Sequence, residues 1–203
     1  MGYNLYITRA VPAYYSTRFP ITGAEVRAVV RSAADLDIPE STSDEHILVT
    51  VGADDWLMFD DGHLHTKSPG DPLVRRMIEI AVELDAHVAG EADEVYDWDG
   101  TGITSVERAP RPSARITSVT TDDWVAAQPD FTWLTELAVD LPSGRRMLPC
   151  PPVACWTGHP SGEPVPFFMD DYSDGVQVVA PDAATLDRLR RLGGFLRAGI
   201  DED

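Results

Sequence analysis

Ile21-Thr22-Gly23-Ala24-Glu25-Val26-Arg27-Ala28 matches a second stretch of the chain, Val119-Thr120-Thr121-Asp122-Asp123-Trp124-Val125-Ala126. In both stretches a β-branched residue, a threonine, an acid, a large apolar residue and an alanine follow in the same order. Later landmarks agree, because Asp61-Gly62 and Asp174-Gly175 each precede a short run, a proline and a helical pattern. The repetition predicts two similar lobes around a pseudo-twofold axis, and a crevice between such lobes is a natural place for a ligand.

The charge balance narrows the partners that the chain can have. Of its 203 residues, 34 are acidic and 16 are basic, which gives a formal net charge of -18. We expect no direct binding to nucleic acid, because phosphate binding needs clustered lysine and arginine. A basic protein partner or a small cationic ligand fits this charge better.

Hydropathy and cysteine content are typical of an ordinary globular protein. Hydrophobic residues make up 43% of the chain, which is enough for a packed core. No apolar run approaches the roughly 20 residues that span a bilayer, and the start of the chain does not resemble a signal peptide. We therefore expect no membrane association and a cytoplasmic location. Cys150 and Cys155 give neither a disulfide framework nor a familiar zinc site.

The first half of the chain has the periodicity of an α+β unit. Thr22 and Glu25 predict a capping box at the start of a helix. Asp60-Asp61-Gly62 predicts the turn of a hairpin, and Asp71-Pro72 predicts the N-cap and first position of a second helix. The strands expected in this half are 5–8, 47–51, 56–59, 63–67 and 86–89.

The second half repeats this order and adds a hairpin near 136–148. Its other expected elements are strands at 115–118, 153–156, 167–169 and 176–179, a short helix from Asp122 and a final helix. The predicted fold class is α+β, with two β-α-β-β-β-α-β units, mixed or antiparallel sheets and helices packed on them. The units are expected at 1–94 and 115–203, with an acidic, proline-containing connector at 95–114.

The strongest local candidate for chemistry is the group His63, His65 and Lys67. Side chains at i, i+2 and i+4 of a strand share one face, whereas the corresponding stretch of the second half, 176–179, is apolar at comparable positions. Such a face could bind an anion, with Lys67 as a point charge, or supply a general base near neutral pH. It could hold a divalent metal if Asp60 or Asp61 added a third ligand, or it could be a solvated sheet face. The sequence by itself assigns no metal and no cofactor.

Paired carboxylates recur at related points of the two halves, as Asp60-Asp61 and Asp170-Asp171. If the pairs face a common crevice, one carboxylate could act as an acid or base with a raised pKa. They could equally hold an ammonium or guanidinium group, or lie in water as turn residues.

Aromatic residues outside the expected core form two further candidate binding regions. The loop that carries Tyr14, Tyr15, Arg18 and Phe19 is more apolar than a connector needs, so it could cover a cleft, meet a partner or pack on its own lobe. The second region is the strand and turn that carry Trp156 and His159, where Trp156 could belong to a ligand site or to the core.

Three segments resemble a group of small uncharacterised bacterial proteins of actinobacterial type, some of which are similar to immunity proteins of toxin systems. The segments are 3–9, 61–69 and 77–91, and they lie in the first half of the chain. The resemblance implies an immunity-like role and brings no established catalytic residues.

Two functions follow as expectations. The first is an acidic cytoplasmic binding or accessory protein that neutralises or supports a partner protein, since a charge of -18 would speed encounter with a basic partner. The alternative is a small cofactor-free acid–base enzyme of specialised metabolism that catalyses a cyclisation, elimination or hydrolysis in the crevice between the units. Its catalytic residues would be Asp60, Asp61, Asp170, Asp171 and His63, with His65 and Lys67 holding an anionic group.

Overall fold

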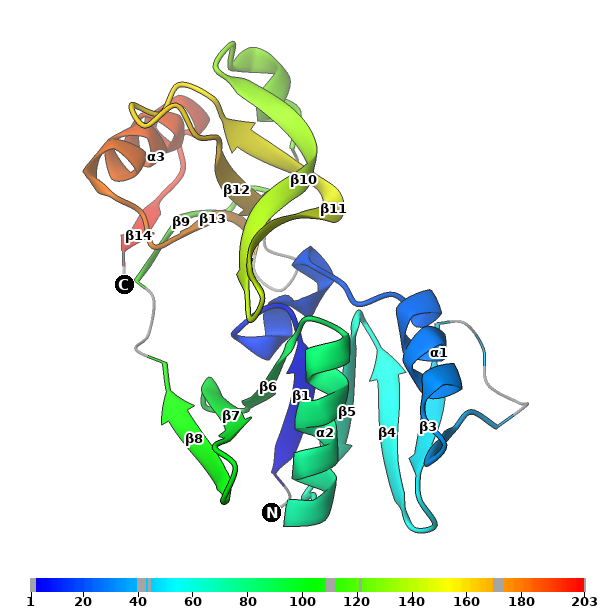
Figure 1. Cartoon of the computed structure of the whole chain (residues 1–203). Coiled ribbons are helices and arrows are strands. Elements are labelled where there is room, and N and C mark those ends of the chain that lie inside the picture. The colour runs from blue at the N-terminus through cyan, green and yellow to red at the C-terminus, as the bar shows by residue number, and fades with distance from the viewer. Residues whose placement is uncertain are drawn as a thin grey trace. The chain divides into compact units, whose positions relative to one another are not determined.

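The chain forms two antiparallel sheets with a few helices (Figure 1). The computed structural model describes residues 3–39, 43, 45–108, 112–120, 122–169 and 174–202. Within these residues one sheet has eight strands and the other has six. The chain divides into two compact units, Met1–Ala109 with Leu137–Pro151, and Pro110–Glu136 with Pro152–Asp203. The α+β class is as predicted, and the sheets are antiparallel.

Unit 1 contains the eight-stranded sheet, whose strand order is β2-β3-β4-β5-β1-β6-β7-β8. Its elements are β1 (Asn4–Thr8), the 3-10 helix η1 (Ala13–Arg18), α1 (Gly23–Ser32), β2 (Leu36–Asp37), β3 (Ile47–Val51), β4 (Asp55–Asp60), β5 (His63–Lys67), α2 (Asp71–Glu83), β6 (His87–Gly90), β7 (Glu94–Trp98) and β8 (Ile103–Glu107). The first strand is central, because β1 pairs with both β5 and β6.

The helices of unit 1 begin where local chemistry allows, with one difference from expectation. Thr22 and Glu25 form the predicted capping box, in which the Thr22 side chain accepts from the Glu25 N–H and the Glu25 carboxylate accepts from the Thr22 N–H. For α2, however, the N-cap is Gly70, which gives no side-chain hydrogen bond. Asp71 instead lies in the first turn, where a negative charge complements the helix dipole.

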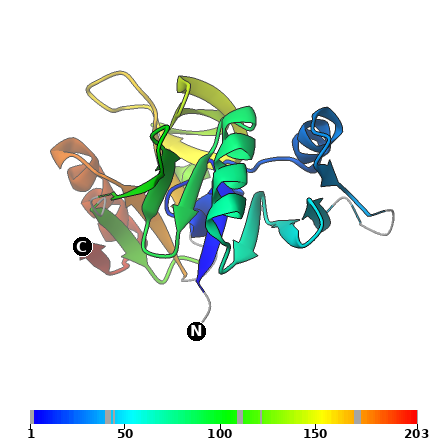
Figure 2. The same cartoon turned by 60° about the horizontal axis from the view of Figure 1, so that its bottom comes forward.

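Both helices pack on one face of the sheet, and this face excludes the polar side chains of β5. Val26 of α1 and Met77 of α2 belong to one buried cluster with Leu5, Ile7 and Leu64 of the sheet. Figure 2 shows α2 against β1, in agreement with the contacts between these elements. Because neighbouring residues of a strand point to opposite faces, the histidines on either side of Leu64 lie on the sheet face away from the helices.

The segment expected to be a connector, 95–114, is largely part of the first sheet. Residues 94–98 and 103–107 form the hairpin β7–β8, and β7 also pairs with β6. The sequence concealed this hairpin because β8 lies at the sheet edge and is mostly exposed, so it needs no apolar alternation. Asp99 tightens the turn by accepting from the N–H groups of Thr101 and Gly102.

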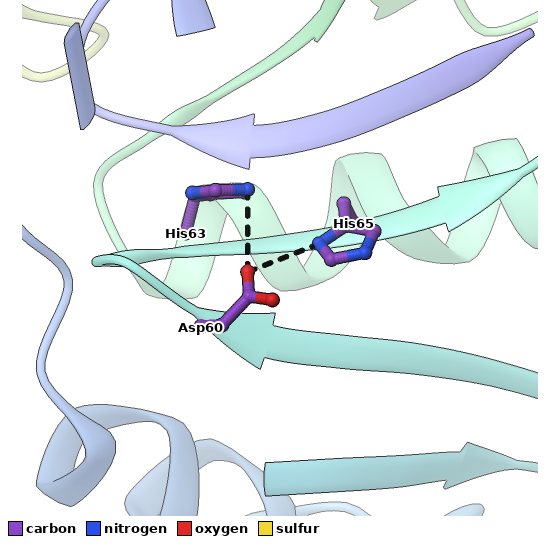
Figure 3. Close-up of side chains that lie close together, drawn as sticks. All are labelled: Asp60, His63 and His65. Carbon is purple, nitrogen blue, oxygen red and sulfur yellow. Dashed lines mark ion pairs between the residues drawn. The ribbon is translucent and has the colours of Figure 1, made fainter. Parts of the chain in front are cut away.

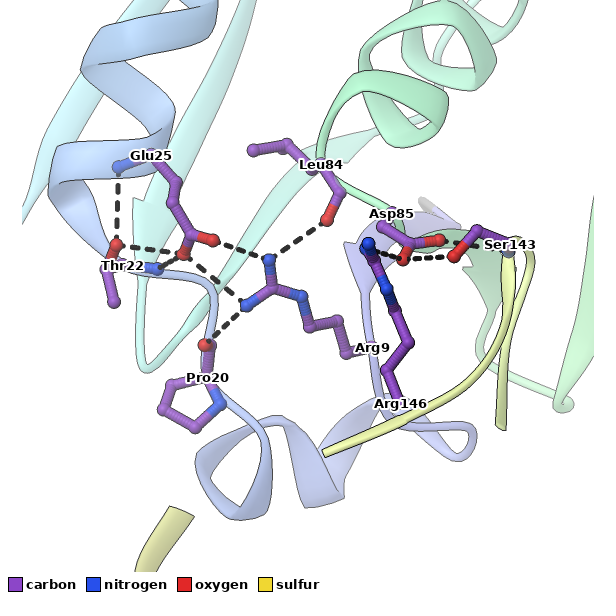
Figure 4. Close-up of polar contacts among 8 residues, drawn as sticks. All are labelled: Arg9, Pro20, Thr22, Glu25, Leu84, Asp85, Ser143 and Arg146. Carbon is purple, nitrogen blue, oxygen red and sulfur yellow. Dashed lines mark hydrogen bonds and ion pairs between the residues drawn. The ribbon is translucent and has the colours of Figure 1, made fainter. Parts of the chain in front are cut away.

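Two polar networks connect distant parts of unit 1 (Figure 4). The Arg9 guanidinium donates to the Glu25 carboxylate and to the carbonyls of Pro20 and Leu84. Next to it, the Asp85 carboxylate accepts from the N–H and hydroxyl of Ser143 and from the Arg146 guanidinium. Charge-assisted bonds of this kind are the stronger hydrogen bonds of proteins, so they hold these segments of unit 1 together.

Unit 2 contains most of the six-stranded sheet, whose order is β10-β11-β12-β13-β9-β14. Its elements are β9 (Ser113–Thr117), the 3-10 helix η2 (Asp123–Ala127), β10 (Phe131–Leu141), β11 (Gly144–Trp156), β12 (Val165–Met169), β13 (Gly175–Val179), α3 (Ala183–Leu196) and β14 (Ile200–Glu202). The expected hairpin with its turn at Pro142-Ser143 is present, but its strands are far longer than 136–148. The helix expected from Asp122 is only a short 3-10 helix.

Each region between the two helical elements holds four strands, not the three of the predicted β-α-β-β-β-α-β order. In unit 1 the additional strand is the two-residue β2, which is too short to give a periodic signal. In unit 2 the long hairpin β10–β11 supplies two of the four strands. Among the described residues, no helix is long and apolar enough to cross a bilayer.

Candidate functional site

Asp60, His63 and His65 converge at the turn between β4 and β5 (Figure 3). Asp60 ends β4, His63 begins β5, and the antiparallel register places these two residues opposite each other. The intervening Asp61 and Gly62 have φ values of 43° and 77°. Two-residue hairpin turns of type I′ need a positive φ at both positions, which explains the Asp-Gly pair. The local sequence therefore builds the cluster.

One oxygen of Asp60 faces a ring nitrogen of each histidine. Asp60 Oδ1 lies 3.5 Å from His63 Nε2 and 3.3 Å from His65 Nδ1. The second contact is close enough for an ion pair, but its geometry is not that of a hydrogen bond, and His65 Nδ1 is buried with no hydrogen-bond partner. Buried polar atoms are nearly always partnered, so this nitrogen needs an explanation.

The second nitrogen of His63 is held by Ser16. Ser16 Oγ donates to the carbonyl oxygen of Asp61 at 3.1 Å and lies 3.0 Å from His63 Nδ1. Because a hydroxyl has only one proton, Ser16 accepts from His63 Nδ1, which must carry the ring hydrogen. In the neutral ring, Nε2 then carries no hydrogen, and its lone pair points at Asp60.

The cluster is sheltered without being closed. The side chains of His63, His65 and Asp60 are 14%, 27% and 28% exposed. Tyr6 lies opposite His65 in the register, and its ring centroid is 5.3 Å from that of His63 and 6.1 Å from that of His65. Burial lowers the pKa of His63 below its usual range because it disfavours the charged imidazolium, although Asp60 acts in the opposite direction.

The spacing of the three ligand atoms suits a small divalent ion. They all lie within 4.8 Å of one another. A tetrahedral ion with bonds of about 2.0–2.1 Å holds its ligand atoms about 3.4 Å apart, as in protein zinc sites. The two measured N···O distances, 3.3 and 3.5 Å, bracket this value. An octahedral magnesium ion would hold neighbouring ligands closer, at about 2.9 Å, and prefers oxygen.

The other candidates from the first half do not join this cluster. Asp61 contributes its carbonyl oxygen to Ser16, not its carboxylate. Lys67 is exposed at the far end of β5, opposite Asn4. The aromatic segment is the 3-10 helix η1, not an open loop, and there Arg18 lies over the ring of Tyr15 at 3.5 Å while Tyr14 is 59% exposed. Phe19 is its C-cap residue.

The remaining candidates belong to the second half. Asp170 and Asp171 lie outside the described residues. Trp156 is buried in the core of unit 2, and its Nε1 donates to Asp130. His159 packs against the Trp156 ring in a T-shaped contact, and its Nε2 contacts Asp182.

Two residues that contact the cluster, Ser16 and Tyr6, were not predicted from the sequence. Ser16 gave no signal, since it lies 47 residues from His63 in a segment noted only for its aromatics. Tyr6 could have been found, because it alternates with the apolar residues Leu5 and Ile7 and so faces the same side as the histidines.

Comparison with protein-family models, curated proteins and solved structures finds no match for this chain.

Proposed function

We propose that this protein binds a divalent transition-metal ion through Asp60 Oδ1, His63 Nε2 and His65 Nδ1, with zinc as the best-fitting ion. The observation that carries the proposal is the pair of ring nitrogens, one of them without a hydrogen-bond partner, that face a single carboxylate oxygen at 3.3 and 3.5 Å.

A cation explains this arrangement better than a proton does. With the ring hydrogen of His65 on Nε2, three acceptor atoms converge without a donor and repel one another, and a proton on one ring nitrogen would satisfy only one of the contacts. A metal ion satisfies all three at once. Ser16 and the Asp61 carbonyl complete the pattern, because metal-binding histidines commonly donate their second ring N–H to a protein oxygen.

The number of protein ligands favours a catalytic metal site over a structural one. Structural zinc sites have four protein ligands, whereas catalytic sites have three and leave one position for water or substrate. The described residues supply three. Metal-assisted hydrolysis, in which the ion lowers the pKa of a bound water, is the reaction type that such a site supports. The cofactor-free acid–base enzyme stays an alternative prediction from the sequence.

Calorimetric titration of the chelator-treated protein with Zn²⁺ tests the proposal directly. We expect one ion per chain, and a blue absorbance with Co²⁺ that reports tetrahedral coordination. His65→Ala and Asp60→Asn should each weaken binding by at least about 100-fold, because each removes a ligand. His46→Ala is the matched control, since His46 is exposed and lies outside the cluster. Absence of binding, or unchanged binding by His65→Ala, would refute the site.

We further propose that the two units derive from one repeated unit. In both sheets the first strand lies between the strand before the last helix and the strand after it, as β5-β1-β6 and β13-β9-β14. The corresponding strand orders support this origin. Binding of a basic protein partner, a cytoplasmic location and an immunity-like role stay predictions from the sequence.

A further inference from the structure

Unit 2 contains a second hydrogen-bonded group, formed by Ser161, His159 and Asp182. Ser161 Oγ lies 2.7 Å from His159 Nδ1, and His159 Nε2 lies 3.0 Å from Asp182 Oδ2. A serine, a histidine and an aspartate joined in this order are the elements of nucleophilic catalysis by serine.

The hydrogen bonds fix the direction of proton transfer. A carboxylate can only accept, so His159 Nε2 carries the ring hydrogen and donates it to Asp182. His159 Nδ1 then carries a lone pair and no hydrogen, which agrees with the hydrogen bond that it accepts from the Ser161 N–H at 3.1 Å. Ser161 Oγ accepts from the Glu163 N–H at 3.2 Å, so its own proton points to His159. Either ring nitrogen of a histidine can serve as a base, and here it is Nδ1 that faces the serine.

The base is held in place and the nucleophile is accessible. Asp182 is the N-cap of α3, where its Oδ1 accepts from the Thr185 N–H at 2.8 Å. These bonds from Thr185 lower the pKa of Asp182 to about 2, so the carboxylate stays charged. The Trp156 ring packs on His159 in a T-shaped contact, and the side chain of His159 is only 11% exposed. Ser161 itself is exposed.

We propose that Ser161 is a nucleophilic serine, with His159 as its general base and Asp182 as the residue that positions the base. The Ser161 proton moves to His159 Nδ1 while Oγ bonds to the carbonyl carbon of an ester and the C=O electron pair moves to oxygen. When that pair returns, the bond to the leaving alkoxide breaks and the alkoxide takes the proton from His159. Water then attacks the acyl-serine in the same way, which releases the acid and restores Ser161.

The surroundings of Ser161 restrict the substrates. The Gly162 N–H already donates to the His159 carbonyl, so of these two neighbouring backbone donors only the Glu163 N–H faces the nucleophile. Each donor to an oxyanion is worth about 10²–10³ in rate. We therefore expect reaction with esters and phosphonyl fluorides, which have good leaving groups, and not with amides.

Labelling of the full-length protein with a fluorophosphonate tests this proposal. Intact-mass analysis should show one adduct, and peptide mapping should place it on Ser161. Ser161→Ala should remove the adduct, whereas the matched variant Ser143→Ala, which lies elsewhere in the chain, should keep it. An unmodified wild-type protein, or an adduct that survives Ser161→Ala, would overturn the proposal.

Two further variants separate catalysis from folding. His159→Gln, which cannot act as a base, should slow labelling at least about 100-fold. Asp182→Asn keeps a good N-cap residue, so it should preserve α3 by circular dichroism and still slow labelling at least about 10-fold. Labelling of Asp182→Asn at the wild-type rate would show that Asp182 only caps the helix, and would overturn its assigned role.

Discussion

β5 of unit 1 follows an Asp-Gly pair, and β13 of unit 2 begins at the glycine of such a pair. Residues at the same distance from that pair nevertheless face the core in one strand and away from it in the other. In β5 the first residue, His63, faces away from the core and Leu64 faces into it. β13 begins one residue earlier relative to its Asp-Gly pair, at Gly175. Its residues Val176 and Val178 face the core. A shift of one residue moves every side chain to the other face of a sheet.

Counted from the Asp-Gly pair, His63 and His65 match Val176 and Val178, but the two valines face the core and the two histidines do not. The residue of β13 that faces away from the core is Gln177, which lies opposite Arg115 of β9. On the face away from the core, the described parts of β13 and β9 therefore carry a glutamine and an arginine side by side. Among the described residues, a group of three candidate metal ligands occurs at the β4–β5 turn and not in unit 2.

The largest effect on the free energy of unfolding should come from a histidine at position 178, which matches His65 when counted from the Asp-Gly pair. Val178 is 1% exposed, so Val178→His should lower the free energy of unfolding by about 2–4 kcal/mol, through overpacking and an unpaired polar group. The reciprocal change His65→Val should alter it by less than about 1 kcal/mol, since His65 Nδ1 makes no hydrogen bond and its contact with Asp60 is partly exposed to solvent. Urea denaturation measures both. Equal stability of Val178→His and wild type would show that this face of β13 is not the core face.

The second effect concerns the residue that approaches the cluster from η1. Ser16→Ala removes the acceptor of the His63 Nδ1–H, so zinc affinity should fall about 10- to 100-fold. The exposed Ser105 provides the control variant, Ser105→Ala, which should bind zinc as the wild type does. Titration calorimetry compares the two. If Ser16→Ala binds normally while His65→Val does not, Ser16 has no role in positioning the ligand.

The third effect is acid sensitivity, which we expect to be concentrated in unit 1. Burial, aided by Arg108, lowers the pKa of His87 to about 4. Between about pH 6.5 and 4 the unfolded chain binds a proton at this position that the folded chain does not, so stability should fall as the pH falls through this window. His87→Gln should flatten that part of the stability curve, whereas replacement of the exposed His46 should leave it unchanged. Denaturant midpoints measured across the window decide the matter.

The smallest effects distinguish the two helices of unit 1. Thr22→Ala removes the capping box of α1 and should cost about 1 kcal/mol. Gly70→Asp would give α2 the side-chain cap that it lacks and should add about 0.3 kcal/mol. Gly70 has a φ of -77°, so an aspartate fits there. Thermal unfolding followed by circular dichroism measures both changes, and a stabilised Thr22→Ala would contradict the capping assignment.

Local signals predicted the parts of the fold that depend on neighbours in sequence. The capping box at Thr22, the turn at Asp61-Gly62 and the alternation of Ile47 to Val51 all have the expected structure. The hairpin β7–β8 was missed because the edge strand β8 is mostly exposed and shows no apolar alternation, so the acids of this region indicated a linker. The N-cap of α2 was misplaced by one residue because Asp71 is also well suited to the first turn.

The sequence alone indicated that His63 and His65 share one face of a strand, next to a turn that carries Asp60 and Asp61, because strand alternation and turn chemistry are local properties. Only the tertiary structure decided which nitrogen of His63 faces Asp60, since that depends on Ser16 from a distant segment. It likewise brought Asp182 to His159, across 23 residues. Proton positions and ligand geometry follow from such long-range contacts, which no periodicity in the sequence encodes.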